Sequence, residues 1–153
     1  MMDKLKEKIF EFLLKRQVLR QVSAPTWDKT RRIAILHSYA NIPHIIKDLE
    51  KQGKEVILFT LPDKNDVCWL SDRPKKKVRE QLKSQHYDIL IDLTQEESLT
   101  LQYMAMYIQA GFKTGRHIKD GIHDLTIDTP AQETPDYLYK QILRYIQMFT
   151  SKK

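Results

Sequence analysis

The sequence is poor in glycine and cysteine, and it lacks a long apolar run. Four glycines occur in 153 residues, and none lies in a G-x-G-x-x-G or G-x-x-x-x-G-K-[ST] pattern. Those patterns form phosphate-binding turns, so the sequence contains no dinucleotide or P-loop signature. The single cysteine, Cys68, excludes an internal disulfide. Because no apolar run approaches the roughly 20 residues of a membrane-spanning helix, we expect no membrane span.

Length and charge limit the class of protein. A chain of 153 residues with 30% charged side chains is typical of one globular domain, and no secretory signal pattern is found, so we expect a cytoplasmic protein. The net charge is +6, but the groups of basic residues that stand out lie in three separate stretches, at 4–20, 73–79 and 113–119. Trp69 is the only large ring near the second stretch, so the aromatic interleaving of single-strand binders is missing. The charge therefore predicts a solvated surface rather than a nucleic-acid site.

The first 24 residues predict an amphipathic helix that precedes a single α/β domain over residues 25–153. Its apolar positions recur at helical spacing: Leu5, Ile9, Phe12 or Leu13, and Leu19. We expect this stripe to pack on the domain, on a protein partner or on a second copy of the chain. The alternative is a membrane-surface anchor. Asp3, Glu7 and Glu11 dilute the positive face of the helix, which favours packing.

The stretch from Tyr87 to Ile118 predicts a strand, a helix and a second strand. Residues 88–93 form an apolar run of strand length, and Thr94 with Glu97 matches a capping box. Gly111 predicts the end of the helix before the next strand. This order of elements is typical of a parallel sheet.

Further strands and helices alternate along the rest of the chain. We predict strands at 32–38, 55–61 and 124–128, and a loop over 63–74 with a short edge strand at 67–70 as the alternative. Helices are predicted after Asn41, with Pro43 in the first turn and Gly53 at the end, over 75–85, and after Thr134 and Pro135. The sequence thus predicts a three-layer Rossmann-like domain. Its sheet is mostly parallel, with five or six strands.

Open parallel sheets bind ligands beyond the carboxyl ends of their strands, so the residues that follow each strand are the candidates. They are Ser38, Asn41, Asp92, Thr94 and Arg116. Helix amino ends at Asn41 and Thr94 would present N–H groups and a positive dipole end, and Arg116 adds a charge. This set predicts a site for a small anionic ligand. Asp92 and Thr94 also fit a simpler role, in which their oxygens complete the strand-to-helix turn.

No catalytic, metal-binding or cofactor-binding set is predicted. The Ser, His and Asp residues at the strand ends lack the G-x-S-x-G turn of a nucleophile, so we predict no triad. His117, His123, Asp124 and Asp128 are close in sequence, but their spacing matches no familiar metal site. His123 is interpreted as a surface or turn residue.

Four stretches together resemble a family of small bacterial proteins of unknown function. They are RRIAILHS, GKEVILFTL, YDILIDLTQEESLTLQYMAMYIQAGFKTGRHI and HDLTID. The resemblance covers nearly the whole chain from about Trp27 onward. It implies a single Rossmann-like domain with an N-terminal helix, and the family has no established activity.

A more distant resemblance is to the amino-terminal half-domain of heptosyltransferase-type GT-B glycosyltransferases, through YDILIDL, the following helix and AGFKTGRH. Those enzymes carry a Gly-Asp pair after the first strand, with the Asp as candidate base. The matching loop here reads Ser38, Tyr39, Ala40, Asn41, and offers no carboxylate to take a proton. The half-domain that holds the nucleotide sugar in that family has no counterpart in this sequence.

The sequence therefore favours a non-catalytic cytosolic domain that binds a protein partner or a small anionic ligand. The alternative is a glycosyltransferase-related enzyme or subunit, with its active site at the strand ends. A third possibility, nucleic-acid binding through the basic surface, rests on charge alone.

Overall fold

A computed structural model describes residues 2–17, 22, 25–38, 42–116, 121–128 and 134–151. It contains one five-stranded sheet in the order β2-β1-β3-β4-β5, and every pairing is parallel. The strands are β1 (Arg32–Leu36), β2 (Glu55–Phe59), β3 (His86–Asp92), β4 (Gln109–Arg116) and β5 (Leu125–Ile127). The predicted three-layer α/β fold is confirmed.

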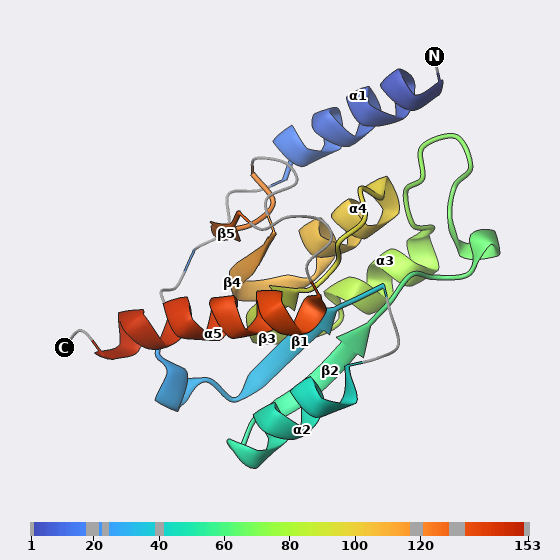
Figure 1. The fold of residues 1–153 in the computed structure, drawn as a ribbon. Helices are drawn as coiled ribbons and strands as arrows, with labels where there is room; N and C mark the ends of the chain where they lie inside the picture. Colours follow the sequence, from blue (N-terminus) through green and yellow to red (C-terminus); the bar gives the residue numbers. More distant parts are fainter. Residues whose placement is uncertain are drawn as a thin grey trace.

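Helices cover both faces of the sheet. They are α1 (Met2–Lys15), α2 (Pro43–Lys51), α3 (Lys76–Lys83), α4 (Leu99–Tyr107) and α5 (Pro135–Ser151), with short 3₁₀ turns η1 (Trp27–Lys29) and η2 (Lys64–Asp66). As Figure 1 shows, α2 and α5 lie on one face, α3 and α4 on the other, and α1 lies outside α4. None of the helices in the described ranges is long and apolar enough to cross a membrane.

Continuous apolar runs occur in β1 and in the second half of β3 because both faces of the sheet are covered there. In β1, Ile33 and Ile35 pack in the core under α2 and α5. Ala34 and Leu36 alternate with them and pack in the core on the side of α3 and α4. A strand buried on both faces has no polar alternation, which explains the continuous runs in the sequence.

Helix ends that depend on local sequence lie where the sequence predicts them. Pro43 is the first residue of α2, and Gly53 follows that helix with a positive φ of 79°. Thr134 caps α5, since its Oγ1 accepts a hydrogen bond of 3.1 Å from the Tyr137 N–H. Asn41, the expected cap of α2, lies outside the described residues.

The predicted boundaries of α4 are wrong at both ends. Ser98 caps the helix, because its Oγ accepts from the Leu101 N–H at 3.3 Å, so Thr94 and Glu97 precede it. Gly111 lies inside β4 and not at the helix end. The helix ends without a glycine because Lys113 Nζ donates to two of its last carbonyl groups, at 2.8 and 2.9 Å.

Residues 67–74 form a loop, as predicted, and the alternative edge strand at 67–70 does not form. Cys68 O accepts from Asp72 N at 2.7 Å, which closes a turn, and an isolated bridge joins Val67 and Pro74. The N-terminal helix ends at Lys15, short of the 24 residues that the sequence predicts for it.

Two lysines are buried and tie backbone segments together. Lys54 Nζ donates to Trp27 O at 2.6 Å and to Thr30 O at 2.8 Å, and lies 4.5 Å from the centroid of the Trp27 ring. Burial is the main cause that lowers the pKa of Lys54. Lys113 Nζ likewise donates to backbone carbonyl groups, at the end of α4. Its side chain is buried, so Lys113 does not belong to an exposed basic surface. A buried ammonium group is tolerated only with such partners.

Replacing Lys113 by Met should destabilise the fold by about 2–3 kcal/mol, because buried carbonyl groups at the end of α4 lose their donor. Urea unfolding monitored by circular dichroism measures the change. The matched control is Lys76→Met, since the Lys76 side chain is 81% exposed, and it should change stability by at most about 0.5 kcal/mol. Equal effects of the two substitutions would contradict the role assigned to Lys113.

Candidate functional site

The candidate site lies at the carboxyl edge of the central strands. In the register of the sheet, Leu36 of β1 is level with Asp92 of β3, which is level with Gly115 of β4. β1 connects to β2 on one side and lies beside β3 on the other, so the winding of the chain changes direction between β1 and β3. Doubly wound folds bind their ligands in the crevice at this switch point.

Asp92 is the most connected side chain at this edge. Its Oδ1 accepts hydrogen bonds from Thr94 N at 3.0 Å and Thr94 Oγ1 at 2.6 Å, and its Oδ2 lies 2.8 Å from His123 Nε2. Asp92 and Thr94 thus close the turn directly after β3, but their oxygens do not cap α4 as the sequence interpretation implies, since that helix begins at Leu99. The Asp92 side chain is 3% exposed, and these three contacts replace the water that a buried carboxylate has lost.

His123 is not the surface or turn residue that the sequence suggests. Its side chain is 1% exposed and faces Asp92. The next residue fixes its position: Asp124 N donates to Lys113 O at 2.7 Å, and Asp124 Oδ2 accepts from Lys113 N at 2.8 Å. These two bonds hold the chain against β4 just before β5 begins, which brings His123 to the carboxyl edge.

Gly115 makes room for the Asp92–His123 pair. A Cβ at this position would lie 2.8 Å from Asp92 Cβ, 2.9 Å from Asp92 O and 3.1 Å from His123 Nε2. Contacts to a backbone atom at that distance cannot be relieved by a side-chain rotation. The glycine in the sequence TGRH is thus required by close approach rather than by its backbone angles.

The pair leaves one imidazole nitrogen available. Nε2 of His123 faces the Asp92 carboxylate, and a ring that donates its Nε2–H to this carboxylate presents Nδ1 on its other side. Nδ1 is buried and has no hydrogen-bond partner among the described residues. An Asp–His pair of this kind can position a base or hold a hydrogen-bonding ligand.

Other buried polar atoms at the same edge have no partner among the described residues. They are Ser38 Oγ, which follows β1, and Thr114 Oγ1 and Arg116 Nε, at the end of β4. Arg116 is held from its other side, since its Nη2 donates to Gln95 O in the segment after β3. Buried polar groups without partners are rare in proteins, and each costs about 1–3 kcal/mol.

The structure brings together four of the five predicted site residues: Ser38, Asp92, Thr94 and Arg116 lie at the carboxyl ends of β1, β3 and β4. The fifth, Asn41, lies outside the described residues. Thr94 contributes through Asp92 and not as a helix cap. The described part of the chain holds no group of three or more His, Cys, Asp or Glu side chains that could bind a metal ion.

His123 is the residue that sequence reasoning missed. Its partner lies 31 positions away, and no spacing rule connects the two. Two residues near it in the sequence were the available signal. Gly115 lies near the end of β4, and Asp124 directly precedes β5. Both indicate close packing of the β4–β5 connection against the sheet.

Replacing Gly115 by Ala should destabilise the protein by about 1–3 kcal/mol, because the added methyl overlaps Asp92 and must push it from His123. Denaturant unfolding measures the loss, and the ring signals of His123 in NMR spectra should shift. The control is Thr126→Ala, since exposed Thr126 is paired with Gly115 in the sheet, and this change should stay within about 0.5 kcal/mol. Unchanged stability and ring signals in the Gly115→Ala variant would contradict the proposed close contact.

Comparison of the chain with known proteins identifies a family but no relative of known function, in keeping with a sequence that contains no familiar motif. The searches against curated proteins and against solved structures returned no significant match. Residues 3–149 match a family described as "Family of unknown function (DUF6913)". This match spans α1, the sheet and most of α5, and thus includes every residue of the candidate site. The chain therefore belongs to the family of unknown function DUF6913.

Proposed function

We propose that the protein binds a small anionic ligand at the carboxyl edge of its sheet. The strand-end site consists of Ser38, Asp92, Thr94, Arg116 and His123. The observation that carries the proposal is the set of buried polar atoms without partners in the described residues: Ser38 Oγ, Arg116 Nε and His123 Nδ1. A bound ligand would supply the missing hydrogen bonds.

The charges of the site favour an anion. Among the described residues no carboxylate pairs with Arg116, whose Nε–H and whose positive charge are both available to an oxyanion. The carboxylate of Asp92 is occupied by Thr94 and His123, which reduces its repulsion of an incoming anion. The net charge of +6 further attracts anions to the protein.

The hydroxyl and imidazole groups define what the rest of the ligand must carry. Ser38 Oγ can donate or accept, and a His123 ring with its only proton on Nε2 accepts at Nδ1. A ligand with an oxyanion next to a hydroxyl group satisfies both, and sugar phosphates and nucleotides have this combination.

We also propose a cytoplasmic location, since the thiol of Cys68 is unpaired and fits a reducing compartment.

A thermal-shift screen tests the proposal, using inorganic phosphate, sugar phosphates, nucleotides and nucleotide sugars. A ligand at 100 times its Kd adds about 2.7 kcal/mol of stability, which raises the Tm of a domain of this size by about 5–10 °C. Arg116→Gln should abolish the shift and Ser38→Ala should reduce it, because each removes a donor to the ligand.

The matched control for that screen is Arg144→Gln, which removes the same charge from an exposed position of α5. This variant should respond to the ligand as the unmodified protein does. Equal losses in Arg116→Gln and Arg144→Gln would show that binding follows overall charge and not the strand-end site. A screen without any shift, with working positive controls, would refute the proposal.

A glycosyltransferase-related activity is the second candidate, because Asp92 orients His123 as a carboxylate orients a general base. In this case the protein should release nucleoside diphosphate from a nucleotide sugar when an acceptor alcohol is present, as ³¹P NMR would detect. His123→Gln should abolish this turnover but weaken ligand binding less than Arg116→Gln does, because Arg116 supplies the charge that holds the anion. Binding without turnover in the unmodified protein would leave the non-catalytic function as the better description.

A further inference from the structure

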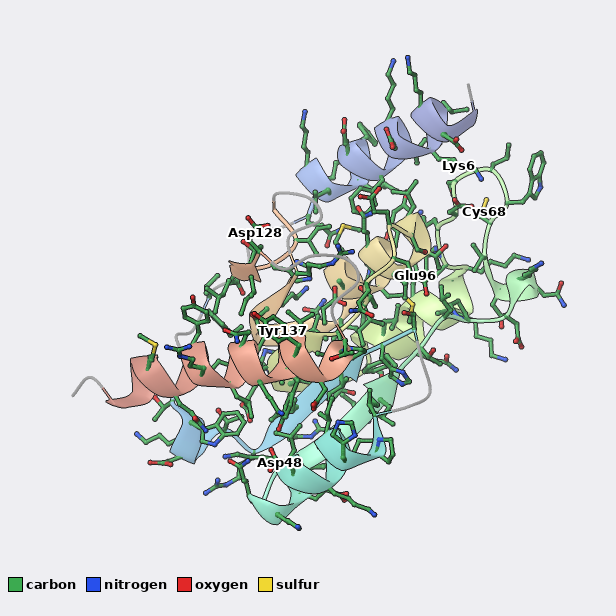
Figure 2. The ribbon with its side chains drawn as sticks, in the orientation of Figure 1. Lys6, Asp48, Cys68, Glu96, Asp128 and Tyr137 are labelled. Carbon is green, nitrogen blue, oxygen red and sulfur yellow. The ribbon has the colours of Figure 1, made fainter. Side chains whose placement is uncertain are left out.

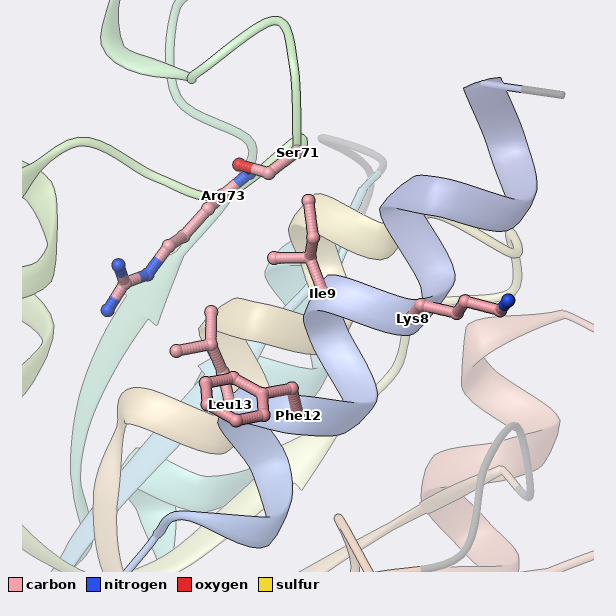
Figure 3. A pocket seen from close by; sticks show the side chains of 6 residues that line it. All are labelled: Lys8, Ile9, Phe12, Leu13, Ser71 and Arg73. Carbon is pink, nitrogen blue, oxygen red and sulfur yellow. The ribbon is translucent and has the colours of Figure 1, made fainter.

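An apolar groove lies on the outer side of α1, away from the strand-end site. One wall is the outward face of the helix, and the other is the groove loop, residues 67–74. The groove has a volume of about 500 Å³ and is lined by Lys8, Ile9, Phe12, Leu13, Ser71 and Arg73. In Figure 3, Ile9 and Leu13 point toward the part of the loop that carries Ser71 and Arg73, while Lys8 points the opposite way.

The helical wall of the groove is fixed by packing. Phe10 is fully buried and meets the ring of Tyr103 edge to face, with 4.7 Å between the ring centroids. Tyr103 in turn stacks on Tyr107 of α4, and burial raises the pKa of Tyr103 to about 12. This aromatic cluster holds α1 on α4, so the helix is docked on its own domain and still keeps its other face open.

The loop wall is fixed by polar contacts. Lys6 Nζ lies 3.1 Å from Asp72 Oδ1, and Figure 2 shows Lys6 beside the groove loop that carries Cys68. Arg73 Nε donates to the Tyr107 hydroxyl at 2.8 Å, and Thr100 Oγ1 donates to Asp72 O at 2.8 Å. Both walls are therefore in place before any partner arrives, which lowers the entropic cost of binding.

The open face of α1 has the pattern of a helix-packing surface. Leu5, Ile9 and Phe12 occur at positions i, i+4 and i+7, and Phe12 is 58% exposed. The groove loop also carries two exposed apolar side chains outside the lining, Trp69, 73% exposed, and Leu70. Amphipathic helices bind grooves through anchors with this spacing, and exposed aromatic side chains carry much of the energy of such interfaces.

The charges around the groove select the occupant. None of the six lining residues is acidic, and the two charged ones, Lys8 and Arg73, stand on opposite sides. Asp72, the nearest acidic side chain of the loop, is paired with Lys6. A helix with an apolar stripe between two rows of Glu or Asp would place opposite charges along both rims.

Two other occupants fit less well. A second copy of α1 would bring Lys4 and Lys8 against the same lysines, and like charges in contact oppose pairing. A flat lipid surface would contact the protruding Phe12 and Trp69 but would leave the concave floor beside Ile9 and Leu13 unfilled. We propose that this groove binds an acidic amphipathic helix of a partner protein. The partner function is independent of the strand-end site.

The test uses the full chain and two fluorescent helical peptides with the same Leu spacing. One carries Glu on both sides of its apolar stripe, and the other carries Lys at those positions. Fluorescence anisotropy should show at least about tenfold tighter binding of the Glu peptide, because only that peptide complements Lys8 and Arg73. Lys8→Glu should reverse part of this preference. No binding of the Glu peptide, or equal binding of both peptides, would overturn the proposal.

Phe12→Ser should weaken binding of the Glu peptide at least about tenfold, since Phe12 is the most exposed anchor of the α1 stripe. The control is Tyr145→Ser, an exposed aromatic on α5 that should leave the affinity unchanged. Circular dichroism verifies that both variants are folded. Vesicles of phosphatidylcholine with phosphatidylglycerol complete the test. If the protein binds these vesicles, loses that binding on Phe12→Ser and does not bind the Glu peptide, the groove recognises a membrane surface. That result would refute the helix partner.

Discussion

The carboxylate of Asp92 is the point on which the carboxyl edge of the sheet depends. One of its oxygens holds the turn that leaves β3 through Thr94, and the other holds the segment that enters β5 through His123. The contact with His123 requires a residue without a side chain at position 115 of β4, because a Cβ there would collide with Asp92 and crowd His123. A single buried charge thus joins three neighbouring strands, and removing it would leave an imidazole and a hydroxyl group buried without partners.

Buried charges are compensated elsewhere in the same local way. Lys54 and Lys113 each donate to two backbone carbonyl groups of one segment, so each ammonium group stabilises the position of that segment against the core. Arg116 differs, because among the described residues its Nη2 donates to Gln95 O while its Nε has no partner. The contrast supports assigning Arg116 to an external anion while the buried lysines belong to the fold.

The sequence predicts those elements whose cause is local. The apolar runs of β1 and β3, the Pro43 and Gly53 limits of α2 and the Thr134 cap of α5 all follow from nearby residues. It fails where a distant residue decides the outcome. Thr94 has the right sequence for a cap but serves Asp92, a lysine and not Gly111 completes the end of α4, and His123 gains its role from a partner two strands away. The strand ends alone place Ser38, Asp92, Thr94 and Arg116 at the carboxyl edge, because topology fixes that edge.

The two proposed surfaces meet through α4. The segment after Asp92 leads to the Ser98 cap of this helix, and Thr100 in its first turn holds the loop that walls the groove. Coupling between the surfaces would require α4 to occupy two positions that a ligand distinguishes. The helix is instead enclosed between the sheet and α1, with its large side chains fully buried, and close-packed interiors resist small displacements. The packing of α4 therefore argues for two sites that act independently, one at the strand ends and one on α1.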